Sequence, residues 1–250
     1  MPKQTSIIKL EGTIDDINFF RTAEGYRARK AARISPEVMA TSPGYQRVRE
    51  NMAEFSRAGK GGRVVRYAFS NLLTHAKGKR VIARLHKEVM KVIKADVVNP
   101  RGQRTVTDGN LGFLQGFEFN NGASLRETLA VQYTTTIDRA AGTARVDLPA
   151  LVPTESIKAP AGATHYRLVC AGAEIDFDTE AYKTDVKESI YLPLTATPAA
   201  ALSLTATVPA ASTHKLLMVL GLQFFQEVNG LYYALKSGEH NALSIVKVDG

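Results

Sequence analysis

Four carboxylates recur at every second position in one short segment: Glu174, Asp176, Asp178 and Glu180. In a β-strand this spacing places all four on one face, with Ile175 and Phe177 on the other. Such a set could bind calcium, although calcium sites also draw backbone carbonyls from an irregular loop, or two members could act as acid and base. No second motif supports either chemistry, so we expect a solvated strand face or a charged contact surface.

A row of basic residues recurs at helical spacing: Arg80, Arg84, Lys87, Lys91 and Lys94. On a helix these positions form a narrow stripe, opposite an apolar row that includes Leu85 and Val89. The stripe could hold a phosphate backbone without base preference, dock an acidic surface of another chain, or be a solvated helix face. It is the candidate surface for binding an anion or a partner.

The other reactive residue types are isolated from one another. The single cysteine, Cys170, lies in an apolar run and is expected to be a buried hydrophobic residue. The five histidines include no pair at metal-ligand spacing, and the sequence has no nucleotide-binding or nucleophile-elbow motif. We therefore expect no catalytic residue, no metal site and no cofactor.

Charge divides the chain into two parts. Residues 1–110 contain 22 Lys and Arg against 10 Asp and Glu, whereas residues 111–250 contain 10 against 14. Most of the basic excess lies in residues 47–104. This division indicates a protein that meets an anionic partner, and that partner could be another copy of the chain.

The basic part predicts a β-hairpin followed by helices. Residues 6–30 interleave apolar and polar side chains around an Ala23-Glu24-Gly25 turn. Ser35-Pro36 and Ser42-Pro43 each read as a helix N-cap followed by proline at the first helical position. A third helix is expected over residues 79–95, with one apolar side: Ile82, Leu85, Val89, Val92 and Ile93.

Between these signals lies a segment whose apolar residues recur on one helical face: Tyr45, Val48, Met52 and Phe55. Three glycines follow, in the run Gly59-Lys60-Gly61-Gly62. Because no strand precedes this run, a phosphate-binding loop is a poor interpretation. We expect the glycines to bend the helix or to form a turn between helices.

Residues 111–250 show strand signals instead. The candidate strands are 113–119, 129–137, 143–148, 165–171, 173–182, 189–194, 202–208, 216–228, 231–235 and 243–248. Asn229-Gly230 between two apolar runs predicts a tight hairpin. Many short strands separated by turns favour an antiparallel, immunoglobulin-like β-sandwich. Residues 149–163 include three prolines and predict a linker.

The N-terminal sequence has no continuous apolar stretch and soon includes acidic residues, unlike a classical signal peptide. The longest apolar run, residues 216–225, is about half of a membrane span. We expect synthesis in the cytoplasm and no membrane partner, while the final location stays open.

Several short runs resemble an uncharacterised family of similar-length proteins from Bacteroidota genomes. They are residues 49–60 (RENMAEFSRAGK), Gly12-Thr13-Ile14, Arg101-Gly102-Gln103-Arg104 and Gln226-Glu227-Val228-Asn229-Gly230. The resemblance spans most of the chain. It implies no activity, ligand or catalytic residue, and it favours a non-enzymatic role.

The sequence thus predicts an α+β protein, with a β-hairpin and a basic helical region in residues 1–110 and an antiparallel β-sandwich in residues 111–250. The expected function is that of a non-enzymatic structural protein that assembles with copies of itself, as in a phage-like particle, tube or fibre. The alternative is a nucleic-acid-binding protein without sequence preference that uses the basic helical region. A third class, an adhesion or carbohydrate-binding sandwich, would use exposed aromatic residues at loop tips, and the chain has no Trp.

Overall fold

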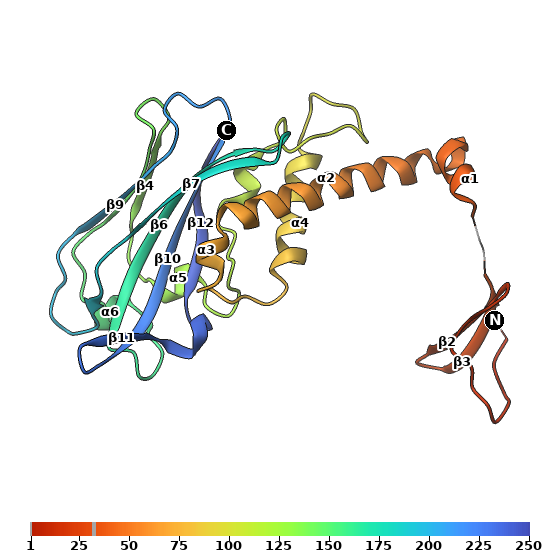
Figure 1. Ribbon diagram of the computed structural model, residues 1–250, viewed down its shortest axis with the longest axis horizontal. Coiled ribbons are helices and arrows are strands. Elements are labelled where there is room, and N and C mark those ends of the chain that lie inside the picture. The colour runs from red at the N-terminus through yellow and green to blue at the C-terminus, as the bar shows by residue number, and fades with distance from the viewer. Residues whose placement is uncertain (1, 32–33) are drawn as a thin grey trace. The chain divides into compact units, whose positions relative to one another are not determined.

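The computed structural model describes residues 2–31 and 34–250 (Figure 1). Contacts divide the chain into two compact units, Met1–Arg49 and Glu50–Gly250. The charge and periodicity of the sequence predict a boundary at residue 110 instead. No division falls there, because the helices before residue 110 and the strands after it contribute side chains to one hydrophobic core.

The first unit is a three-stranded antiparallel sheet followed by short helices. Its elements are β1 (Gly12–Ile14), β2 (Ile17–Thr22), β3 (Gly25–Lys30), α1 (Pro36–Thr41) and the 3-10 helix η1 (Pro43–Tyr45). The predicted hairpin is confirmed as β2–β3, and Ser35 caps α1 by accepting a hydrogen bond from the Val38 N–H. No described residue from 2 to 49 is buried, so this unit has no core.

The helix α2 (Gln46–Ala68) includes the last four residues of the first unit and continues in the second. The other helical elements of the second unit are α3 (Ser70–Leu73), α4 (Val81–Lys94), η2 (Leu111–Leu114), α5 (Leu125–Thr128), α6 (Pro153–Ser156) and η3 (Leu235–Gly238). Its strands are β4 (Thr134–Asp138), β5 (Thr143–Leu148), β6 (His165–Asp176), β7 (Ala181–Glu188), β8 (Leu192–Pro193), β9 (Leu202–Thr207), β10 (Lys215–Val228), β11 (Leu231–Ala234) and β12 (Ala242–Asp249).

These strands form two antiparallel sheets that pack face to face. The larger sheet has the order β11-β10-β6-β7, with β12 also paired to β10 and β8 to β6, and the smaller has the order β4-β5-β9. One core lies between the two sheets, and a second lies between the larger sheet and helices α2 to α4. Figure 1 shows the helices on one side of the larger sheet and β4 and β9 on the other. The predicted α+β class is confirmed.

The central strands β6 and β10 are buried on both faces, which explains their long apolar runs. On β6, Val169 and Ala171 pack toward the helices, whereas Leu168 and Cys170 pack toward the smaller sheet. The apolar run of residues 216–225 is likewise the middle of β10. Within the described residues, no helix is long and apolar enough to cross a membrane.

Three predicted elements are wrong. Residues 113–119 are not a separate strand: the first two end η2, and the Gly116 and Phe119 N–H groups then donate to carbonyls of β12. Strands were expected over residues 165–171 and 173–182, with a break between them. Instead β6 runs without a break to Asp176. Residues 149–163 are not a linker, because Leu151 and Ile157 are buried between the two sheets.

The glycines of α2 do not bend or break the helix, contrary to expectation. They permit close packing instead. A Cβ atom on Gly61 would lie 3.1 Å from Val106 Cγ2 and 3.2 Å from Val89 Cγ1. Glycine is therefore the residue that lets α2 approach α4 and the loop after it.

Candidate interaction surface

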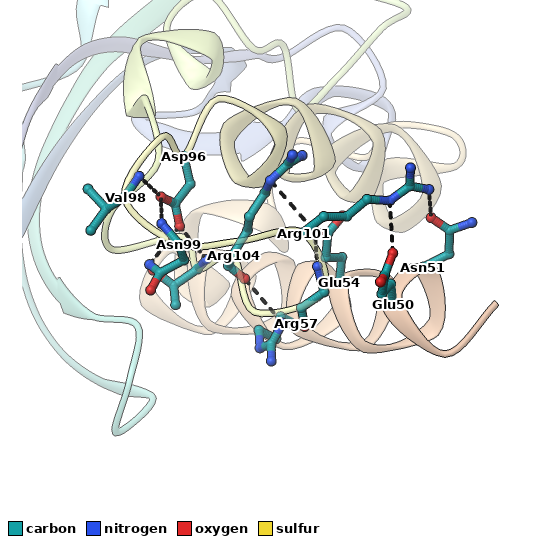
Figure 2. Close-up of polar contacts among 11 residues, drawn as sticks. Glu50, Asn51, Glu54, Arg57, Asp96, Val98, Asn99, Arg101 and Arg104 are labelled. Atoms are coloured by element: carbon teal, nitrogen blue, oxygen red, sulfur yellow. Dashed lines mark hydrogen bonds and ion pairs between the residues drawn. The ribbon is translucent and has the colours of Figure 1, made fainter. Parts of the chain in front are cut away.

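A loop of the second unit, residues 95–108, is fixed against α2 by polar contacts (Figure 2). The carboxylate of Glu54, buried on α2, accepts a hydrogen bond of 2.8 Å from the Gly102 N–H. Arg57 donates to the carbonyls of Gly102 and Arg104, at 2.8 and 3.2 Å. Two segments distant in the sequence, residues 49–60 and 101–104, therefore lie against each other.

Asp96 organises the start of this loop. Its carboxylate accepts hydrogen bonds of 2.8 to 3.0 Å from the N–H groups of Val98, Asn99 and Thr105 and from the Asn99 amide. Desolvation acts to raise the pKa of Asp96, but these hydrogen bonds outweigh it and lower the pKa to about 2. The ionised carboxylate thus holds the loop in one shape, and the loop in turn supports α2.

The predicted basic stripe is only partly formed. Arg80 precedes α4 with a positive φ of 53°, so it lies outside the helix. Arg84 does not point into solvent: it donates to the carbonyls of Glu118 and Phe119, at 2.6 and 2.7 Å, and lies over the Phe117 ring. Lys91 pairs with Glu88.

Lys87 and Lys94 remain exposed on α4, as the helical spacing predicts. Together with Arg80, they are the members of the stripe that are available to an anion. The helical period correctly placed Leu85 and Val89 in the core but could not show where the long Arg84 side chain ends.

The four acidic residues do not share one strand face, contrary to prediction. Glu174 and Asp176 lie on β6, but the strand ends at Asp176. There the Asp176 carboxylate accepts the N–H groups of Asp178 and Thr179, which turns the chain, and Glu180 follows with a φ of 60°. Asp178 and Glu180 therefore lie in the β6–β7 turn.

Each of these carboxylates has a partner within the chain. Ser212 donates to Glu174, and Thr107 donates to Asp178 at 3.1 Å. Glu180 pairs with Arg63 of α2 and lies 3.8 Å from the Lys60 ammonium. These contacts attach the β6–β7 turn to α2 and its neighbouring loop.

Exposed apolar side chains gather where α2 meets α4. Met52 and Phe55 are one turn apart on α2, with 57% and 62% of their surface exposed. The Phe55 ring lies 4.1 Å from the ring of His86 on α4, and Ile82, one turn before His86, is 64% exposed. We call these four residues (Met52, Phe55, Ile82 and His86) the α2 patch.

The predicted apolar face of α2 is thus not its core-facing side. Tyr45 is half-buried, Val48 is exposed, and both lie in the first unit. The buried residues of α2 are mostly small: Glu54, Ala58, Gly61, Gly62, Val64, Val65 and Ala68. Close helix packing favours small side chains, so the large apolar residues mark the uncovered side. Ile82, expected in the core, lies on that side as well.

Glu118 is a titratable group of the second unit that no sequence pattern indicates. It lines a cavity of about 420 Å³ together with Tyr133, Leu129 and Ser244. One carboxylate oxygen accepts the Leu125 N–H at 3.1 Å, and the other is buried with no hydrogen-bond partner among the described residues. Burial raises the pKa of Glu118 to about 7, against the lowering effect of that N–H. Sequence periodicity carries no signal for such a site.

The β10–β11 hairpin presents exposed aromatic residues. Tyr232 is stacked on Tyr191 with ring centroids 4.1 Å apart, and Tyr233 is exposed at the neighbouring position. Arg167 lies 5.3 Å from the centres of the Tyr191 and Phe225 rings. This cluster fixes the base of the hairpin to the larger sheet.

Cys170 is buried between the sheets as expected, and burial raises its pKa to about 12. In the part of the chain that the structure describes, no group of three or more His, Cys, Asp and Glu side chains could hold a metal ion. Comparisons of the chain with protein-family models, with curated proteins and with solved structures give no match.

Proposed function

We propose that this protein is a non-enzymatic structural protein that assembles with copies of itself, as a component of a phage-like particle, tube or fibre. One observation carries the proposal. Apolar side chains are left uncovered both in the α2 patch and in the coreless first unit, where residues 2–31 expose five large aliphatic side chains: Ile7, Ile8, Leu10, Ile14 and Ile17.

A small sheet needs a buried apolar face to be stable, because ordering its backbone costs about 1–2 kcal/mol per residue. The first unit buries no described residue and so lacks this compensation. A neighbouring molecule that covers these isoleucines would provide it. Exposed apolar clusters on a folded protein are also the usual mark of an interaction site.

Sedimentation velocity over a range of protein concentrations tests the proposal, and electron microscopy shows the form of any assembly. We expect species larger than a monomer at micromolar concentration. Because the uncovered surfaces are apolar, these species should persist at about 1 M salt, where exposed ion pairs are screened. A monomer at every concentration and salt would contradict the proposal.

Nucleic-acid binding is the second candidate, and a feature of the first unit favours it. On its sheet, Arg29 lies 5.0 Å from the centre of the Phe20 ring and Arg21 lies 5.6 Å from that of Tyr26. Arginine and aromatic side chains interleaved on a sheet can hold phosphates and stack bases.

Fluorescence anisotropy with a random single-stranded oligonucleotide tests this candidate. Binding should weaken steeply with salt, and Arg29→Glu should weaken it much more than Lys94→Glu if the sheet is the contact surface. Greater weakening by Lys94→Glu than by Arg29→Glu would instead indicate contact through the basic helical region. Absence of binding at low salt would rule this candidate out.

A further inference from the structure

We propose that the tip of the β1–β2 hairpin in one copy of the protein docks on the α2 patch of a second copy. The inference rests on the proposed self-assembly and names its contact surfaces.

The hairpin tip has one apolar and one polar face. Ile14 and Ile17 are directly opposite each other across the Asp15-Asp16 turn, and they are 59% and 47% exposed. Directly opposed residues point to the same face of a sheet, so the two isoleucines form one apolar projection. The next pair, Thr13 and Asn18, faces the other way and is joined by a side-chain hydrogen bond of 2.8 Å.

The α2 patch is a preformed receptor for such a projection. Its backbone belongs to two helices whose inner residues are fully buried, including Ala58 on α2 and Leu85 on α4. The Phe55 carbonyl oxygen lies 3.0 Å from His86 Nε2, which joins the two helices at the patch. A surface that is already ordered loses little conformational entropy when it binds.

The charges around the two surfaces favour contact of a tip with a patch over contact between two tips or between two patches. Near the tip, the acidic residues Glu11 and Asp16 are exposed together with one base, Lys30, which lies opposite Ile17 on β3. Immediately before Ile82, by contrast, the exposed charged residues are both basic, Lys79 and Arg80. Two tips brought together would place acidic residues against each other, and two patches would do the same with basic residues. A tip on a patch brings opposite charges together, which supports it over both like pairings.

Pairing of two different surfaces also fits the proposed function. Each copy would offer one tip and one patch, so every bound copy leaves a free surface for the next. Such head-to-tail contacts generate rings when the rotation closes and filaments when it does not. A ring, tube or fibre can be built from repeated interfaces of this kind.

Cysteine cross-linking between full-length chains tests the contact. One chain carries Ile14→Cys and the other, with a different affinity tag, carries Met52→Cys; the native Cys170 is buried and should not react. Mild oxidation of the mixture should join the two tagged chains by a disulfide. The matched control, Thr13→Cys on the polar face of the same hairpin, should give at least tenfold less of this product.

A second variant separates this inference from the proposed function. Met52→Asp changes an exposed residue, so the fold should be retained, and self-association should weaken at least tenfold in sedimentation. Gln103→Asp, on the exposed loop beside α2, is the control and should leave association unchanged.

Three outcomes would overturn the inference. If wild-type chains associate but neither the mixed cross-link nor the Met52→Asp effect is seen, the docking contact is wrong and self-assembly stands. If a single chain that carries both Ile14→Cys and Met52→Cys forms only an intrachain disulfide, the tip docks within its own chain. If wild-type chains never associate, both the inference and the proposed function fall.

Discussion

The Arg84 guanidinium donates hydrogen bonds to the main-chain carbonyls of Glu118 and Phe119, in the segment that pairs with β12. Arg84→Ala should therefore reduce the free energy of unfolding by about 1–3 kcal/mol, because hydrogen bonds to a charged group are lost from a partly buried site. Lys87→Ala, at an exposed position of the same helix, should change it by no more than about 0.5 kcal/mol. Urea denaturation of both variants measures the difference, and equal small effects would contradict the structural role of Arg84.

Asp96 should make the protein sensitive to acid. Its pKa is lowered to about 2 in the folded protein, below the ordinary value of 3.8. A lowered pKa means that the ionised form stabilises the fold above about pH 4 and that this stability is lost as pH falls toward 2. Asp96→Asn should therefore cost about 1–3 kcal/mol at pH 7 and much less at pH 2.5. Thermal denaturation at the two pH values, compared with wild type, provides the measurement.

Glu118 should have the opposite pH dependence. Its pKa is raised to about 7, so the folded state holds a proton that the unfolded state releases near pH 4.5. Stability from this group is complete below pH 4.5 and falls as pH rises through 7. After allowance for solvent screening, Glu118→Gln should be more stable than wild type by roughly 1 kcal/mol at pH 8 and not at pH 4.5. A variant with the same relative stability at both pH values would argue against the raised pKa.

Sequence periodicity predicts which side chains face the core, but not which distant groups a side chain will contact. The helical period identified Leu85 and Val89 as core residues, since it describes where a Cβ atom points. It could not identify the partners of Arg84 or the burial of Glu118, because both depend on segments distant in sequence. The carboxylates of Asp178 and Glu180 were misplaced for a similar reason: the Asp176 side chain ends the strand by capturing backbone N–H groups.

At the scale of elements, the glycines of α2 provide a contrast between two nearby positions. A Cβ atom on Gly59 would meet only His86 Cδ2, at an ordinary contact distance of 3.9 Å, whereas one on Gly61 would press against Val106 and Val89. Gly59→Ala should stabilise the fold by about 0.5–1 kcal/mol through helix propensity. Gly61→Leu should destabilise it by about 1–3 kcal/mol through overpacking.

Urea denaturation of the two glycine variants measures both effects under one condition. Stabilisation by both substitutions would mean that α2 and α4 are less closely packed than described. Destabilisation by both would mean that Gly59 has a packing role of its own.

Elements with strong local signals were predictable, and the others were not. The Asn229-Gly230 turn, the β5 strand and the Ser35 cap follow from short patterns that fix backbone geometry. The prediction that the glycine run bends or ends the helix is wrong, because tertiary packing, rather than propensity, decides whether a glycine is tolerated in a helix. The prediction of a linker over residues 149–163 is wrong, because prolines also occur in packed segments between strands.

At the scale of the whole molecule, the two units should differ in what they contribute. Deletion of residues 2–31 removes no buried side chain, so the melting temperature of the remainder should change by no more than about 2 °C. The same deletion should abolish self-association, because it removes the exposed isoleucines. Calorimetry and sedimentation measure the two properties separately. Loss of the folded state would show that the first unit stabilises its own chain.

The β10–β11 hairpin offers an attachment point for foreign sequences. The pairing of β10 with β6 ends at Phe225 and His165, and beyond it β11 remains paired with β10 as far as the Asn229-Gly230 turn. Residues 226–234 are exposed throughout. A peptide or a fluorescent label grafted at this turn would be displayed on the surface without disturbing the layers of the sandwich. If the protein forms regular assemblies, each copy would then present the graft at a defined repeat.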